Sequence, residues 1–150
     1  MNFKQTASTH KRGFTLIELL VVVAIIGLLS SIVLLNMKNT RLQAYDVNIQ
    51  SLMHQLRNEA EFIYAQNGES YSAICDENNN TLNNNDKIGT IEIRIKDNNN
   101  GQDVICIEST DGKNFAASSP LIARSEKYWC IESAGLSREI DNQITTAHCE

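Results

Sequence analysis

A single carboxylate stands in the most apolar part of this 150-residue sequence. Glu18 lies within residues 14–35, where Thr15 is the one other residue that is neither apolar nor small. An ionised carboxylate costs on the order of a few kcal/mol in lipid, and such residues usually mark function. Among apolar helices that exclude water, the Glu18 carboxylate needs a partner. The simplest alternative is that Glu18 lies near the end of the helix and reaches water at the lipid headgroups.

The four cysteines are the second chemical feature. Cys75, Cys106, Cys130 and Cys149 all follow the apolar segment. An even number of cysteines beyond a membrane segment predicts two disulfides formed in an oxidising compartment. No pair has Cys-x-x-Cys spacing and the three histidines are scattered, so we predict no metal site. The sequence leaves the pairing open, because four cysteines can be joined in more than one way.

Motifs for catalysis are missing from the sequence. It has no Gly-rich phosphate loop, no His-Glu-x-x-His and no Gly-x-Ser-x-Gly, so we predict neither an enzyme nor a cofactor. Residues 97–103 loosely resemble a calcium loop but lack its full spacing and its distal Glu, so a plain turn is favoured. Without Lys4, Lys11 and Arg12 the chain has 10 basic and 18 acidic residues, a net charge of −8, which argues against broad binding of nucleic acid.

Residues 14–35 form the apolar segment that must position Glu18. At about 1.5 Å per residue, these 22 residues would span roughly 33 Å as a helix, close to the hydrocarbon core of a bilayer. A secretory signal peptide has a shorter apolar core and a small-residue cleavage site, whereas residues 36–39 are Asn-Met-Lys-Asn. We therefore predict a membrane-spanning helix. Gly27 and Ser31 lie four residues apart on it and would allow close approach of a neighbouring helix.

The sequence Lys-Arg-Gly-Phe-Thr-Leu-Ile-Glu and the apolar run after it resemble the amino-terminal signature of type IV pilins and pseudopilins. The resemblance implies that residues 1–13 are a leader, held on the cytoplasmic side by charges that include Lys11 and Arg12, in agreement with the positive-inside rule. It also implies that a prepilin peptidase cleaves between Gly13 and Phe14, and that Phe14 is then N-methylated. Gly13 has no side chain to obstruct the protease.

For Glu18 the resemblance implies a role in filament assembly. Its partner would be the Phe14 ammonium of a neighbouring subunit, and such a pair would set the axial register, as a lone polar group does in a coiled coil. The implied partners are other pilins in a homo-oligomer or hetero-filament, the prepilin peptidase and methyltransferase, and an inner-membrane assembly platform. The implied location is a single-pass membrane protein with its head outside the cytoplasm, and later an extracellular or periplasmic filament.

The fold that we predict is α+β and pilin-like. One continuous helix would run from about residue 14 to residue 65. Its hydrophobic half, residues 14–35, would protrude, and its amphipathic half, residues 36–67, would pack against a small antiparallel sheet within a head of residues 68–150. The 3–4 spacing of apolar residues in the amphipathic half predicts the packed face, and Asp46 is assigned to another face. Asn-Gly at residues 67–68 predicts the end of the helix.

The head is predicted to contain an Asn-rich loop followed by strands. Asparagine-rich runs favour turns, and alternating isoleucines favour a half-buried strand. The predicted elements are a loop at residues 69–87, a strand at 91–95, a hairpin loop at 97–101, a strand at 104–107, a turn at 110–112 and a strand at 127–131.

For the disulfides we favour two pairs. Cys75–Cys106 would join the loop after the helix to the sheet. Cys130–Cys149 would then hold the tail in a loop like the carboxyl-terminal disulfide region of many pilins. Both pairs place the cross-links in the head.

Several roles within the resemblance stay open. The chain could be a major pilin, a minor pilin, or a pseudopilin of a type II secretion or DNA-uptake system. Two predicted disulfides favour a pilus subunit, whereas the lack of a proline near residue 35 favours a pseudopilin or minor subunit; Pro120 is the one proline. A membrane-anchored adhesin or DNA-binding tip subunit is the alternative from another class. A basic and aromatic surface cluster would favour it, and the candidates are Lys113, Arg124, Lys127, Tyr128 and Trp129.

Overall fold

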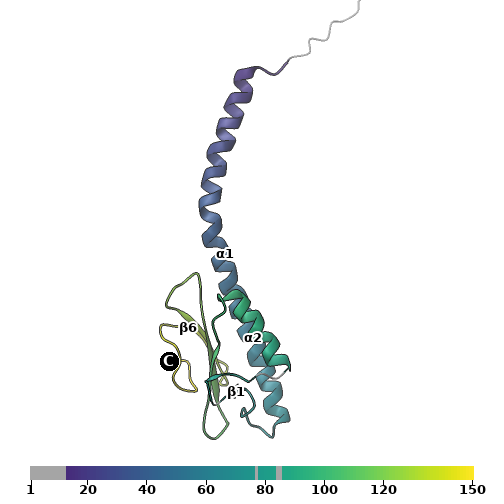
Figure 1. The fold of residues 1–150 in the computed structure, drawn as a ribbon, viewed down its shortest axis with the longest axis vertical. Coiled ribbons are helices and arrows are strands. Elements are labelled where there is room, and N and C mark those ends of the chain that lie inside the picture. The colour runs from purple at the N-terminus through teal and green to yellow at the C-terminus, as the bar shows by residue number, and fades with distance from the viewer. Residues whose placement is uncertain (1–12, 77, 84–85) are drawn as a thin grey trace, which may run out of the picture. The chain divides into compact units, whose positions relative to one another are not determined.

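The computed structural model describes residues 13–76, 78–83 and 86–150. The chain divides into two compact units, Met1–Lys38 and Asn39–Glu150. Helix α1 (Leu16–Gln66) has residues in both units. Helix α2 and the strands belong to the second unit, which has a pilin-like α+β fold (Figure 1). From here on the whole of this unit, residues 39–150, is called the head, so it includes the part of α1 that follows residue 38 as well as the predicted head of residues 68–150.

Helix α1 ends where the sequence predicts. The amide of Asn67 donates to the carbonyl of Ile63 at 2.8 Å, and the amide of Glu69 donates to the carbonyl of Tyr64 at 3.0 Å. Between them Gly68 has φ +66°, a left-handed conformation that glycine adopts without a steric penalty. The predicted long helix is therefore confirmed, with its bounds at Leu16 and Gln66.

The sheet is a six-stranded antiparallel meander in which each strand pairs with the next along the chain. Its strands are β1 (Cys75–Asp76), β2 (Thr81–Leu82), β3 (Ile105–Glu108), β4 (Phe115–Pro120), β5 (Tyr128–Glu132) and β6 (Ser137–Ile140). The predicted strands at 104–107 and 127–131 are confirmed as β3 and β5. The turn predicted at residues 110–112 is confirmed and connects β3 to β4.

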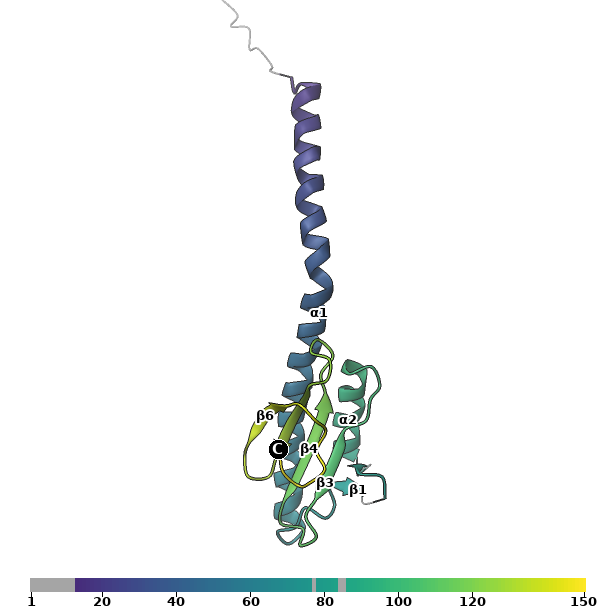
Figure 2. The same cartoon turned by 90° about the vertical axis from the view of Figure 1, so that its left-hand side faces the viewer.

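Both faces of this sheet are covered. On one face, Phe115 and Ala117 of β4 belong to a core that includes Ile49 and Leu56 of α1. On the other face, Ala116 packs in a second core with residues of the carboxyl-terminal segment, among them Ile144 and Cys149. Figures 1 and 2 show the helices on one side of the sheet and the yellow carboxyl-terminal segment on the other. All six residues of β4 are buried because this strand lies between the two layers.

The strand predicted at residues 91–95 is wrong, because this segment belongs to helix α2 (Asp86–Asn98). Ile88 and Ile95 are fully buried and Ile91 is partly buried, which is the 3–4 spacing of a helix face. Ile93 is 61% exposed. In a half-buried strand it would lie on the same buried face as Ile91 and Ile95. Over so short a run, three alternating isoleucines fit the period of a strand and that of a helix. Buried Ile88, three residues before Ile91, fits only the helix.

The hairpin loop predicted at residues 97–101 is also wrong. These residues form the end of α2, where the amide of Gly101 donates to the carbonyl of Lys96 at 2.8 Å. Asn100 and Gly101 have φ of 62° and 78°, and both residue types tolerate this conformation. Asparagine followed by glycine indicates a chain reversal of either kind, a hairpin turn or a helix end.

The loop predicted at residues 69–87 is partly wrong. It contains the short strands β1 and β2, and α2 begins before its end. Strands β4 and β6 were not predicted. Phe-Ala-Ala-Ser-Ser-Pro of β4 and Ser-Arg-Glu-Ile of β6 each contain a single residue of the β-branched and aromatic types that mark strands. Pairing with neighbouring strands is therefore what reveals them.

Asp46 joins α1 to the loop between β4 and β5, and its assignment to a face away from the core is wrong. Its side chain is only 2% exposed. One oxygen, Oδ1, accepts hydrogen bonds from the backbone amides of Ile122 at 2.7 Å and Ala123 at 3.2 Å. The other, Oδ2, lies 3.8 Å from Nε of Arg124. Buried amides need acceptors, so this carboxylate is a structural part of the core.

Replacing Asp46 by alanine is expected to lower the free energy of unfolding by about 3 kcal/mol, because two partly buried amides lose a charged acceptor. Asp46→Asn keeps one acceptor oxygen and is expected to cost roughly half as much. Urea unfolding of the full-length protein in detergent measures both. The control is Asp97→Ala, an exposed carboxylate in no ion pair within the described part of the chain. Equal stability of Asp46→Ala and this control would refute the assignment.

Two disulfides cross-link the head, and they join the pairs that we favoured. Cys75 bonds to Cys106, and Cys130 bonds to Cys149, with sequence separations of 31 and 19 residues. The second bond holds the carboxyl-terminal segment on the outer face of the sheet. The backbone amide of Cys149 also donates to Oε2 of Glu132 at 2.9 Å, so the tail is fixed by a covalent and a polar contact.

Replacing Cys130 and Cys149 together by serine is expected to lower the free energy of unfolding by about 3 kcal/mol, the usual value for a loop of this length. Release of Ile144 would uncover the outer apolar face, so we also expect stronger binding of a hydrophobic dye. Urea unfolding and dye fluorescence measure the two effects. The paired replacement of Cys75 and Cys106 serves as the comparison, because it loses a cross-link without freeing the tail. Equal dye binding by the two double variants would contradict the role given to the tail.

Candidate processing and assembly site

Gly13 and Phe14 lie just before α1 in non-helical backbone. Both are exposed, and the Phe14 side chain is 77% exposed. A Cβ atom built on Gly13 would meet no described atom within 4 Å. A peptidase could therefore reach the bond between these two residues. Packing against the described residues sets no demand for glycine at position 13, so such a demand would come from the enzyme.

Thr15 and Glu18 form a reciprocal pair at the start of α1. The backbone amide of Thr15 donates to Oε2 of Glu18 at 2.8 Å, and the Thr15 hydroxyl donates to the same oxygen at 2.7 Å. In return, the backbone amide of Glu18 donates to the Thr15 hydroxyl oxygen at 3.3 Å. This is a capping box, which provides partners for amides that the first turn of a helix leaves without carbonyls.

The capping box changes the account of Glu18 that the sequence suggested. In the single chain the carboxylate already has partners three residues away, and it lies where a helix favours negative charge. Thr15 was overlooked as its partner. The signal was present, since a threonine followed three residues later by glutamate at the start of an apolar run predicts this motif.

The apolar side chains of α1 between Leu16 and Leu34 are all exposed within the described chain, with values such as 86% for Leu16 and 60% for Leu29. By length and composition α1 could cross a membrane. So much uncovered apolar surface needs a lipid or protein environment. The segment is thus consistent with a membrane-anchored precursor.

Gly27 and Ser31 are joined within this segment, because the Ser31 hydroxyl donates to the carbonyl of Gly27 at 2.9 Å. A hydroxyl satisfied by its own helix can enter lipid without an unpaired donor. A Cβ atom built on Gly27 would meet no described atom within 4 Å. The use of this small face for packing against a second helix stays a prediction.

Of the remaining sequence candidates, the leader charges Lys11 and Arg12 lie outside the described residues. Among the described residues, no group of three or more His, Cys, Asp or Glu side chains could hold a metal ion. The site therefore consists of an accessible Gly-Phe bond, a capping box and an uncovered apolar helix.

Comparison with protein families places a known motif on this site. Residues 8–34 match the family model described as the prokaryotic N-terminal methylation motif. No curated protein and no solved structure matches the chain. The chain thus carries the N-terminal methylation motif typical of type IV pilins and pseudopilins.

Proposed function

We propose that this chain is a structural subunit of a type IV pilus or a related filament. It is cleaved after Gly13, N-methylated at Phe14 and polymerised through its amino-terminal helix. The observation that carries the proposal is the methylation motif at residues 8–34, with Glu18 set in a segment whose apolar side chains the chain itself leaves exposed. In a lone membrane anchor the capping box with Thr15 already accounts for this carboxylate, so the motif is what favours a filament subunit.

Within the described residues the Glu18 carboxylate has hydrogen-bond partners but no cation beside it. Cleavage supplies a cation. Cutting before Phe14 creates an α-amine, which in an unperturbed peptide has a pKa of about 7.7–8.0. Methylation to a secondary amine preserves a basic nitrogen. When apolar helices pack together and exclude water, Glu18 can pair with the amine of a neighbouring subunit. The pair fixes the register of the helices, because any slip would leave a charge unpaired.

The partners follow from this sequence of events. The prepilin peptidase and methyltransferase act on Gly13 and Phe14. The inner-membrane platform collects the anchored subunits, and other pilins of the same or a different chain receive them. The head, outside the cytoplasm, is the part that forms its two disulfides in an oxidising compartment.

A pseudopilin of a type II secretion or DNA-uptake system is the second candidate. It is favoured by α1, which is assigned as helix without a break from Leu16 to Gln66, and by the lack of any proline in that stretch. Proline is the usual cause of a sharp kink. Location separates the two candidates, since a pilus subunit is recovered outside the cell and a pseudopilin stays in the envelope.

The adhesin or DNA-binding alternative gains no support from the head. Two of the cations proposed for its surface cluster are neutralised, because Lys127 pairs with Asp141 and Arg124 pairs with Glu139. Trp129 is partly buried and packs against the main core. At Arg124 and Lys127 a nucleic acid would therefore meet ion pairs in place of free positive charge.

Shearing filaments from the cells that make this protein tests the proposal. We expect the chain in the sedimented filaments of cells that have the prepilin peptidase, and only in membranes when that peptidase is deleted. Recovery in the envelope fraction alone, in a processed form, would favour the pseudopilin. Equal release from both strains would contradict any filament role that depends on processing.

A further inference from the structure

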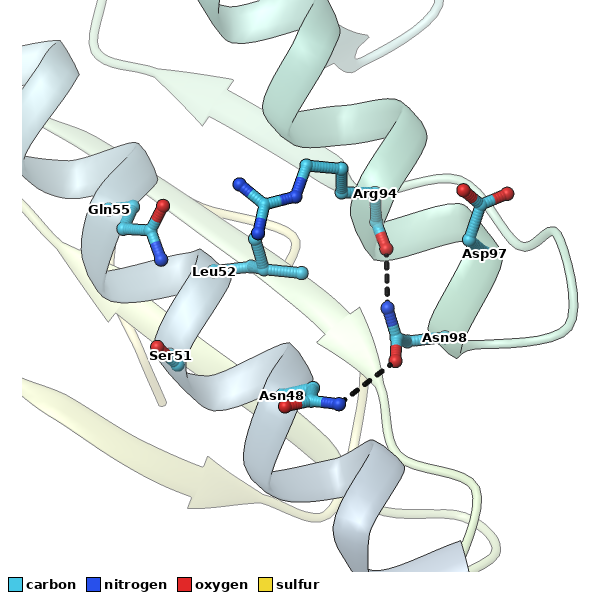
Figure 3. A pocket seen from close by; sticks show the side chains of 7 residues that line it. All are labelled: Asn48, Ser51, Leu52, Gln55, Arg94, Asp97 and Asn98. Atoms are coloured by element: carbon cyan, nitrogen blue, oxygen red, sulfur yellow. Dashed lines mark hydrogen bonds between the residues drawn. The ribbon is translucent and has the colours of Figure 1, made fainter.

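A polar groove lies between α1 and α2 on the head (Figure 3). Its volume is about 310 Å³. Buried Leu52 gives it an apolar patch on the α1 side. The other lining residues are polar: Asn48, Ser51 and Gln55 from α1, and Arg94, Asp97 and Asn98 from α2.

At one end of the groove, two asparagines form hydrogen bonds that join α1 to α2. Nδ2 of Asn98 donates to the carbonyl of Arg94 at 2.7 Å, and Nδ2 of Asn48 donates to Oδ1 of Asn98 at 3.4 Å. These bonds link the two helices and fix Asn98. The side chains of Ser51 and Gln55 have no hydrogen bond within the described part of the chain. The groove therefore has unbonded side chains, Ser51 and Gln55, next to the end that the asparagine hydrogen bonds fix.

Arg94 is the charge that defines the groove. Figure 3 shows its guanidinium extending from α2 over Leu52 towards Gln55, while the carboxylate of Asp97 points away from it. Within the described residues Arg94 takes part in no ion pair. A guanidinium presents several donors in a planar fork that fits a carboxylate in a bidentate way. Its natural ligand is thus an anion.

The other two cations of α2 do have carboxylate partners. Lys96, on the same helix, lies 2.7 Å from Asp103 and 3.1 Å from Glu92, and these contacts, that with Asp103 first, raise its pKa above the ordinary value. Lys87 pairs with Glu59 at 3.0 Å. Arg94 differs from these two neighbours because its guanidinium has no carboxylate partner within the described residues.

A second copy of the chain is the partner that fits this charge. From residue 39 onward the sequence has 9 basic and 17 acidic residues, a net charge of −8, so an adjacent head presents mostly carboxylates. A helical filament also needs a heterologous contact, in which one surface of a subunit meets a different surface of the next. A groove with a free guanidinium facing an acidic neighbour provides such a contact.

We propose that the α1–α2 groove receives an acidic side chain from the head of a neighbouring copy, with Arg94 pairing with its carboxylate and Ser51 and Gln55 completing the contact. This inference rests on the proposed filament function. It adds a contact between heads to the packing of the amino-terminal helices. It also makes assembly sensitive to the sign of the charge at position 94.

Charge reversal in the full-length chain tests the pairing. We expect Arg94→Glu to lower the yield of sheared filaments by about tenfold or more, because like charges then face each other across the contact. Arg94→Lys keeps the charge and is expected to lose less. The matched control is Lys113→Glu, which makes the same change in net charge at an exposed site that bonds to the carbonyl of Glu69. Equal yields from Arg94→Glu and Lys113→Glu would overturn the proposal.

Photo-crosslinking identifies the occupant. A photoreactive residue in place of Gln55, in assembled filaments, is expected to join two copies of the chain through a peptide of the head that contains Asp or Glu. Loss of this adduct in the Arg94→Glu background would support the pairing. Filaments that form normally but give an adduct only with a different protein, or none between copies, would overturn it.

The failure of this inference differs from the failure of the proposed function. If the wild-type chain is not cleaved at Phe14 and forms no filaments, the filament function itself is wrong. If it is cleaved, methylated and assembled while Arg94→Glu behaves as the Lys113→Glu control does, only the groove contact is wrong.

Discussion

Replacing Glu18 by glutamine is expected to leave cleavage after Gly13 intact and to lower filament yield by about tenfold or more. Glutamine at this position preserves the capping box, since an amide oxygen can accept from Thr15 as the carboxylate does. It removes the charge that would pair with the Phe14 amine of a neighbour. The yield of sheared filaments and the mass of the mature amino terminus measure the two effects separately.

A matched variant separates the charge of Glu18 from its capping role. Thr15→Val removes the hydroxyl of the capping box and keeps the carboxylate, at a cost of about 1 kcal/mol in helix stability. We expect Thr15→Val to lose less filament than Glu18→Gln. If Thr15→Val lowers the filament yield as much as Glu18→Gln does, assembly depends on the capped start of the helix and not on the charge of Glu18. Full assembly and full methylation of Glu18→Gln would contradict the register pair.

Replacing Gly13 by valine is expected to block maturation. The peptide bond after Gly13 is accessible and a Cβ atom there meets nothing in the described chain, so the fold should tolerate valine. A branched side chain beside the scissile bond would displace it within the protease, and small displacements of a reacting bond can cost roughly a hundredfold in rate. Pulse labelling followed by gel analysis of precursor and mature forms measures the rate.

Gly27→Val provides the control for Gly13→Val, since it adds the same side chain to another open glycine of the segment. We expect it to be cleaved at the wild-type rate, whatever its effect on assembly. Normal cleavage of Gly13→Val would show that the peptidase does not read this glycine. It would then remove the main reason for placing the leader boundary at residue 13.

The candidate site could be found from sequence because its signal is local. Gly13, Phe14 and Glu18 are recognised by their order along a few residues, and residues 8–34 match a family model. The long helix was predictable for a related reason, since its apolar periodicity and its Asn-Gly end are properties of one continuous stretch. Thr15 could also have been found in this way, because a capping box is a short motif.

The head was less predictable because its signals are not local. Alternating Ile91, Ile93 and Ile95 fit a strand as well as a helix, and the choice depends on burial against α1. β4 contains mostly small residues, and it is a strand because β3 and β5 pair with it on either side. Asp46 is buried because two amides far along the chain need an acceptor, which no spacing on α1 reveals.

The amino terminus of the native protein tests the central claim most directly. Mass spectrometry of protein isolated from its own filaments or membranes is expected to give a chain that begins at Phe14 and carries an added methyl group, with a minor precursor that retains residues 1–13. The same result is expected to disappear when the prepilin peptidase is deleted. Assembled material with an intact Met1 terminus, or a mature chain that begins at another residue, would contradict the account.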